Sequence, residues 1–77
     1  MNAKRRKEIK KFYNRMLDMK EQLEAIRDEE QEAFDNMPEP IQYSDRGQQM
    51  EEKIEQMDSA LDSMQEVIDY LEEVLNE

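Results

Sequence analysis

The strongest pattern in the chain is a run of apolar residues between positions 50 and 75. Their spacing alternates between four and three: Met50, Ile54, Met57, Leu61, Met64, Ile68, Leu71 and Leu75. This alternation forms the a and d positions of a heptad repeat. A second row, Ala60, Val67 and Val74, follows the g positions. The pattern predicts an amphipathic helix over residues 45–76, with an apolar face wide enough for a helix bundle.

A second heptad series precedes this one and predicts a helix over residues 3–36. Its members are Ile9, Phe12, Met16, Met19, Leu23, Ile26, Glu30, Ala33 and Met37. Residues 3–35 contain no glycine or proline and are rich in strong helix formers. Glu30 is the one charged member, and we interpret it as a polar residue that sets the register near a bundle end. The methionines of both series fall on the apolar seams, which favours core packing over a soft-metal site.

A turn over residues 37–44 separates the two helices. Pro38 and Pro40 disfavour helix at the residues before them. Ser44 is a good N-cap, and Asp45 follows it in the first turn, where the helix dipole favours an anion. Gly47, the only glycine, lies in the same turn, and we interpret it as a point where the helices approach closely.

The two apolar series mirror each other about Pro40. Folding the chain back there pairs Ile26 with Ile54 and Ile9 with Leu71, with the intervening pairs in step. Each pair sets an a position against a d position, as antiparallel packing requires. The same register places Glu30 opposite Met50, and Ala33 opposite Gly47. We therefore expect an all-α fold, an antiparallel two-helix hairpin resembling a coiled coil, in a single domain over residues 1–77.

Several apolar residues lie off the a and d seams. A single hairpin cannot cover all of them, so we expect a homodimer or higher oligomer, with a four-helix bundle of two hairpins as the favoured form. The residues expected at its interface are Tyr13, Phe34, Ala60, Val67 and Val74.

Composition excludes much chemistry. The chain has no cysteine and no histidine, which removes disulfides, thiolate metal sites, the commonest general base and the usual zinc ligand. The acidic clusters do not follow the spacing of a calcium-binding loop and are typical of a solvated face. We expect neither enzyme activity nor a cofactor or metal. No apolar run approaches the ~20 residues that span a membrane, so we expect a cytoplasmic protein.

The net charge of −10 is unevenly spread. Residues 1–20 hold eight basic and two acidic residues, whereas residues 21–77 hold three basic and nineteen acidic ones. The basic N-terminal region could neutralise the acidic end of the second helix (Asp69, Glu72, Glu73 and Glu77), bind a phosphate-bearing ligand, or contact a protein surface. Its candidate contact residues are Lys4, Arg5, Arg6, Lys7, Lys10, Lys11, Tyr13 and Arg15. The negative net charge argues against duplex DNA as a partner.

The region around the turn resembles a known group of proteins. It comprises Asp28-Glu29-Glu30-Gln31-Glu32-Ala33-Phe34-Asp35-Asn36-Met37-Pro38-Glu39, Ser44-Asp45-Arg46-Gly47, Met50-Glu51, and the run Ile54-x-x-Met57-Asp58-x-Ala60-Leu61-Asp62-x-Met64. These residues resemble the small acidic helical-hairpin proteins that bacteriophages and other bacterial mobile elements encode, a group without an assigned biochemical activity.

The resemblance implies a phage or prophage origin, action in the bacterial cytoplasm, and binding to a host or phage protein. On this interpretation the chain is a non-enzymatic interaction protein that inhibits a host component such as a defence system. One possible mode of inhibition is mimicry of nucleic acid by its acidic helices. The alternative is an oligomeric binder that sequesters a nucleotide signal through its basic N-terminal region.

Overall fold

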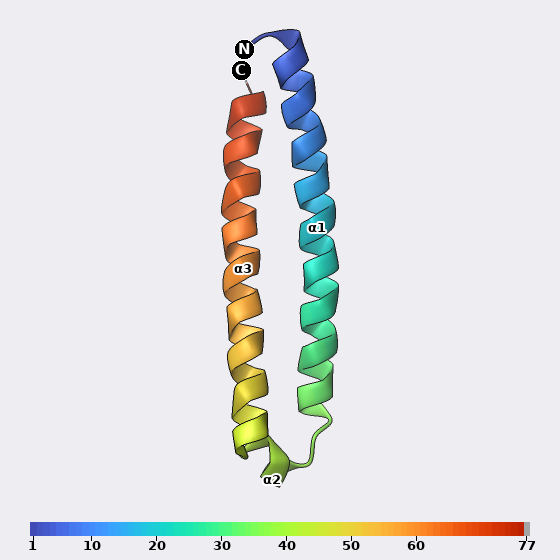
Figure 1. Cartoon of the computed structure of the whole chain (residues 1–77), viewed down its shortest axis with the longest axis vertical. Helices are drawn as coiled ribbons and strands as arrows, with labels where there is room; N and C mark the ends of the chain where they lie inside the picture. Colours follow the sequence, from blue (N-terminus) through green and yellow to red (C-terminus); the bar gives the residue numbers. More distant parts are fainter. Residues whose placement is uncertain (77) are drawn as a thin grey trace.

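The computed structural model describes residues 1–76, so Glu77, one of the acidic residues considered above, lies outside the described part. Helix α1 (Ala3–Asp35) and helix α3 (Asp45–Leu75) run antiparallel along a hairpin 58 Å long and 15 by 13 Å across (Figure 1). A short helix, α2 (Glu39–Gln42), lies in the turn. The predicted all-α, two-helix hairpin is confirmed.

Side-chain caps begin both long helices. The Asn2 side chain accepts a hydrogen bond of 2.8 Å from the backbone N–H of Arg5, at the start of α1. Ser44 is the N-cap of α3, as predicted, and its hydroxyl accepts a bond from the N–H of Gly47. Each cap satisfies a backbone donor that has no partner within its helix.

The turn is more ordered than the two prolines alone indicate. Pro40 lies within the first positions of α2, where its missing N–H costs nothing. The side-chain amide of Gln42 donates a bond of 2.9 Å to the carbonyl oxygen of Phe34 in the last turn of α1. This bond satisfies one of the carbonyl groups that a helix end leaves open.

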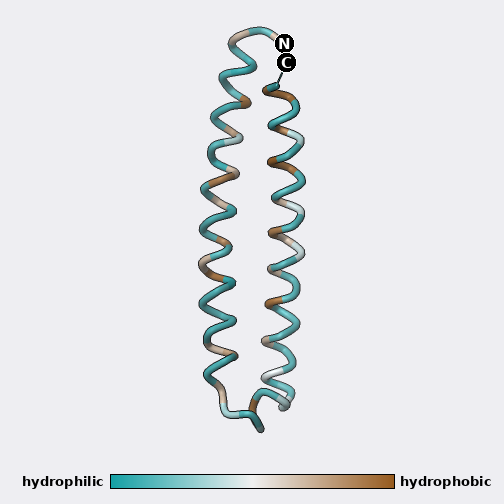
Figure 2. Tube along the Cα trace, turned by 180° about the vertical axis from the view of Figure 1, so that it is seen from behind, coloured by the Kyte–Doolittle hydropathy of each residue, from teal (hydrophilic) through white to brown (hydrophobic). Residues whose placement is uncertain are grey.

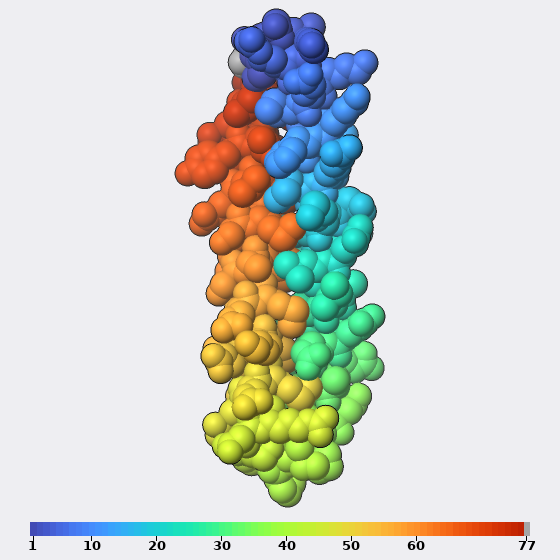
Figure 3. Space-filling view, viewed as in Figure 1, coloured from blue at the N-terminus to red at the C-terminus, as the bar shows by residue number. Residues whose placement is uncertain are grey.

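The seam of α3 faces α1, as its heptads predict. Ile54 and Ile68 are buried, and the other seam residues from Met50 to Leu75 are half-buried. Apolar positions recur at intervals along both helices (Figure 2), whose side chains meet along the length of the hairpin (Figure 3). Because two helices have only one line of contact, most seam residues keep part of their surface in water.

The face that α1 turns to α3 differs from the predicted one. Ile9, Met16 and Leu23 are half-buried as expected, but Phe12, Met19 and Ile26 have exposed fractions of 52%, 55% and 56%. The row one residue further on takes their place, and it consists of Tyr13, Lys20, Arg27 and Phe34. The predicted pairs of Phe12 with Ile68 and of Ile26 with Ile54 are therefore wrong. Helix α1 is rotated about its axis by about 50°, half the ~100° between successive residues.

Polar contacts explain why this row faces α3. The Arg27 guanidinium binds the Asp58 carboxylate, and the Tyr13 hydroxyl binds that of Glu72. Long amphipathic side chains can lay their apolar stems against a neighbour while the polar ends remain in water. The rotation thus gives these side chains partners on α3, and it leaves the more apolar row outside.

Gly47 is buried by close packing, but the atoms nearest to it belong to Ile41 and Gln42 of the turn, and Ala33, which we expected opposite it, is exposed. A Cβ atom built at Gly47 would overlap the carbonyl oxygens of Gln42 and Ile41. The glycine therefore lets the backbone of the turn pass directly over the first turn of α3.

We predict that Gly47→Ala destabilises the protein. In an open helix, glycine to alanine gains about 1 kcal/mol, but here the added methyl group meets rigid backbone, and overpacking of this kind costs about 1–3 kcal/mol. Urea unfolding followed by circular dichroism measures the change, with Ser59→Ala on the exposed side of α3 as the control. A Gly47→Ala protein as stable as the parent would contradict this account of the turn.

Candidate interaction surface

The rotation of α1 leaves an apolar row on one side of the hairpin, formed by Phe12, Met19, Ile26 and Ala33. On α3, the heptad row of Ala60, Val67 and Val74 is also exposed, with exposed fractions of 40% for Val67 and 38% for Val74. We call these seven residues the apolar face. Whether they form one surface depends on whether the two rows lie on the same side.

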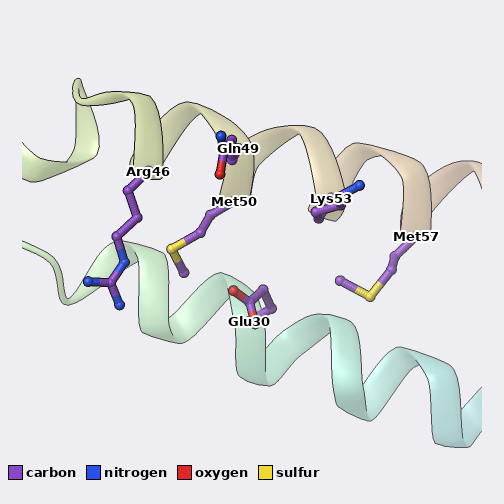
Figure 4. Close-up of a pocket in the computed structure, with 6 residues that line it drawn as sticks. All are labelled: Glu30, Arg46, Gln49, Met50, Lys53 and Met57. Atoms are coloured by element: carbon purple, nitrogen blue, oxygen red, sulfur yellow. The ribbon is translucent and has the colours of Figure 1, made fainter.

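A groove near the turn shows that they do. It lies between the helices and is lined by Glu30 of α1 and by Arg46, Gln49, Met50, Lys53 and Met57 of α3. In Figure 4, Met50 and Met57 extend from α3 toward α1 on either side of Glu30. Lys53 and Arg46 precede Ala60 by one and two heptads, so the row of Ala60, Val67 and Val74 continues along the side of this groove.

Helix α1 turns its apolar row toward the same side as the groove. The residues of α1 that contact the opposite side of α3 are Tyr13, Arg27 and Phe34. Phe12, Met19 and Ile26 come one residue before the inward-facing row of Tyr13, Lys20 and Arg27. At ~100° per residue, they therefore lie on the other side of the row formed by Ile9, Met16 and Leu23. Both rows of the apolar face thus border the same side of the hairpin as the groove.

The side of α3 that carries the groove and the row of Ala60, Val67 and Val74 contains no acidic residue. The row that flanks Ala60, Val67 and Val74 on the outer side of α3 contains Gln49, Gln56, Ser63 and Tyr70. All acidic residues of α3 lie on the rest of its circumference: Asp45, Glu51, Glu52, Glu55, Asp58, Asp62, Glu66, Asp69, Glu72 and Glu73. The hairpin therefore separates an apolar surface from a strongly acidic one.

The opposite side of the hairpin is held by polar contacts, and we call it the ion-pair edge. Arg27 binds Asp58 through two contacts, Nε to Oδ1 at 2.8 Å and Nη2 to Oδ2 at 3.3 Å. The hydrogen bond to Asp58 raises the pKa of Arg27. The Tyr13 hydroxyl donates a hydrogen bond of 2.7 Å to Glu72, and this bond, with desolvation and the nearby negative charge, raises the pKa of Tyr13.

Two of the residues predicted at an oligomer interface lie on this edge. Tyr13 and Phe34 are half-buried between the helices, so the expectation that a single hairpin leaves them uncovered is wrong. Ala60, Val67 and Val74 do lie exposed on the apolar face. The sequence analysis missed Phe12, Met19 and Ile26 as surface residues. The signal available was the amphipathic row of Tyr13, Lys20, Arg27 and Phe34, which has the same heptad spacing.

The basic N-terminal region surrounds the start of α1. Arg6 is half-buried, and its guanidinium donates a hydrogen bond of 2.8 Å to the carbonyl oxygen of Leu75, joining the two ends of the hairpin. The other basic candidates, Lys4, Arg5, Lys7, Lys10, Lys11 and Arg15, are exposed. At ~100° per residue, Lys4, Lys7, Lys11 and Arg15 share one face of α1, whereas Arg5 and Lys10 point away from it. Their contact with a partner stays a prediction.

Within residues 1–76, no group of three or more acidic side chains is arranged to hold a metal ion. None of the helices in that range is long and apolar enough to cross a membrane. Comparison of the chain with models of protein families, with curated proteins and with solved structures gave no match.

We predict that Tyr13 titrates above the ordinary tyrosine pKa of 10.0. Because the folded-state pKa is raised, the bond to Glu72 stabilises the fold below pH 10 and is lost as the pH rises through the raised value. The difference in tyrosinate absorbance between the parent and Tyr13→Phe isolates this group, and Glu72→Ala should move its midpoint back toward 10.0. A midpoint at or below 10.0 in the folded parent would show that the bond does not form in solution.

Proposed function

We propose that the chain is a non-enzymatic interaction protein that acts as a homodimer and binds a basic partner through its acidic surface. The observation that supports this most directly is the separation of the two surfaces. An apolar face free of acidic residues on α3 suits association, while the carboxylates on the rest of α3, apart from Asp58 and Glu72, remain available to a partner.

The exposed area supports the dimer. The hairpin has an accessible surface of 6055 Å². A folded monomer of 9.4 kDa is expected to expose about 5,000 Å². The excess of about 1,000 Å² is comparable with the ~800 Å² that each partner buries in a standard protein interface. A second copy on the apolar face would therefore bring the exposed area per chain to that of an ordinary globular protein.

The energy available at the apolar face is sufficient for such an interface. Full burial of a large apolar side chain contributes about 1.5–3 kcal/mol. Phe12, Met19 and Ile26 are about half exposed and Val67 somewhat less. Covering them contributes about half of the full value for each, and the sum over two copies amounts to several kcal/mol. A two-fold dimer is the commonest way for such a surface to be covered by itself.

The acidic surface points to the chemistry of the external partner. Residues 21–57, the half of the hairpin that contains the turn, hold twelve acidic and three basic residues. A rod of exposed carboxylates attracts basic grooves of the kind that bind nucleic acid. Together with the resemblance to acidic hairpin proteins of phages, this supports a role as an inhibitor of a host protein, such as a defence component, in the bacterial cytoplasm. Sequestration of a nucleotide has less support, since the basic residues of one chain other than Arg6 lie on an exposed helix surface.

We predict that Val67→Glu weakens the dimer at least tenfold, because it places a charge on a surface that becomes apolar and dry. The matched control is Glu66→Lys, a change at the neighbouring position outside the apolar face, which should leave the dimer intact. Light scattering coupled to gel filtration over micromolar concentrations measures both. A folded, helical monomer in the parent would overturn the proposal, and equal effects of the two substitutions would show that another face associates.

The acidic surface is tested by affinity capture from a nuclease-treated bacterial lysate with identification by mass spectrometry. We expect basic nucleic-acid-binding proteins to be retained, then released by salt and by duplex DNA. The triple variant Glu52→Lys, Glu55→Lys and Asp62→Lys should lose them. A control with Lys4→Glu, Lys7→Glu and Lys11→Glu should keep them. Equal capture by the acid-reversed variant would contradict binding through this surface.

A further inference from the structure

We infer that the second copy lies on the apolar face with its turn at the same end, so that α1 of each hairpin packs against α3 of the other. This inference rests on the proposed homodimer and adds its orientation. Two hairpins joined face to face by a two-fold axis have two choices. With the turns at the same end, α1 lies over the partner's α3. With the turns at opposite ends, α1 lies over α1 and α3 over α3.

The position of the apolar residues along the hairpin favours the arrangement with the turns together. Phe12, Met19, Ala60, Val67 and Val74 lie in the half of the hairpin that carries the chain termini, and Ile26 and Ala33 lie in the half that contains the turn. Toward the turn, the same side continues as the groove. With the turns together, the terminal half of one hairpin covers the terminal half of the other, and apolar residues therefore contact apolar residues.

The opposite arrangement would set Arg46 and Lys53 against the region of Phe12 and Val67. Neither cation has an ion pair within the described residues. Covering an unpaired charge with apolar side chains costs several kcal/mol. The two cations of the groove thus oppose the arrangement with the turns apart.

The charges of whole helices point the same way. Helix α1 carries nine acidic and nine basic residues, whereas α3 carries ten acidic and two basic ones. With the turns together, each α3 lies between two copies of α1, and the two α3 helices occupy diagonal corners of the bundle. With the turns apart, the two α3 helices lie side by side, and their like charges repel each other at short range.

The arrangement also supplies a partner for Lys53, one of the two groove cations. Glu29 is exposed, and its heptad position lies next to the apolar row of α1, on the side away from α3. It therefore lies at the edge of the apolar face. Its neighbour Glu30 lines the groove at the level of Met50, between Arg46 and Lys53. With the turns together, α1 of the second copy reaches the same level, and its Glu29 lies opposite Lys53. Each dimer therefore contains this pair twice.

The test measures distances between spin labels, which the absence of cysteine in the chain makes straightforward. A single label at Glu39→Cys in the turn should give an intermolecular distance of about 15–30 Å, as set by the ~8–10 Å spacing of helix axes. A label at Lys4→Cys, at the other end, should give a similarly short distance. Distances near the 58 Å length of the hairpin for both labels would overturn the orientation while leaving the homodimer standing.

A charge exchange provides the second arm. Lys53→Glu and Glu29→Lys should each weaken the homodimer, because each sets like charges together twice. An equimolar mixture of the two should restore association severalfold, because the heterodimer pairs opposite charges at both contacts. Lys53→Glu and Glu66→Lys combined in one chain should not restore it, because the repulsion at Glu29 remains at both contacts. A mixture no tighter than its components would overturn the inference, and helical monomers of the unsubstituted protein would overturn the homodimer as well.

Discussion

Two helices share a single line of contact, and this limit governs the rest of the structure. Within residues 1–76, the packing of α3 on α1 buries only two large apolar side chains, Ile54 and Ile68. The remaining seam residues are half in water, and a further apolar row on each helix has no neighbour. The hairpin is well defined by its heptads, but as a single copy it covers little of the surface that those heptads provide.

The way α1 uses its one contact line determines both outer surfaces. By facing α3 with Tyr13 and Arg27, it gains a hydrogen bond to Glu72 and a two-point ion pair with Asp58. Exposed pairs of this kind each contribute little to stability, and the apolar parts of Tyr13, Arg27 and Phe34 that lie against α3 add to them. They hold the more apolar row of Phe12, Met19 and Ile26 outward, beside the exposed row of α3. The result is a face suited to association and an acidic remainder suited to a basic partner.

The sequence predicted α3 better than α1 for a physical reason. In α3 the a and d positions from Met50 to Leu75 are all apolar and the flanking positions on one side are acidic, so the seam cannot turn toward that side. In α1, the row of Ile9, Met16 and Leu23 has an apolar row on one flank and an amphipathic row on the other. Heptad spacing cannot choose between them, because both have the same period. The choice depends on Asp58 and Glu72 of α3, which are far away in sequence. The candidate surface was therefore half predicted: Ala60, Val67 and Val74 were named, whereas Phe12, Met19 and Ile26 were placed in the hairpin seam.

The central claim is that a second copy covers the apolar face, and the concentration dependence of thermal unfolding tests it most directly. If folding and association are coupled, mass action raises the unfolding midpoint as the protein concentration increases. Circular dichroism over a hundredfold range of concentration should therefore show a steadily rising midpoint. A midpoint that stays constant over that range would show that the hairpin folds alone, with its apolar face exposed to water.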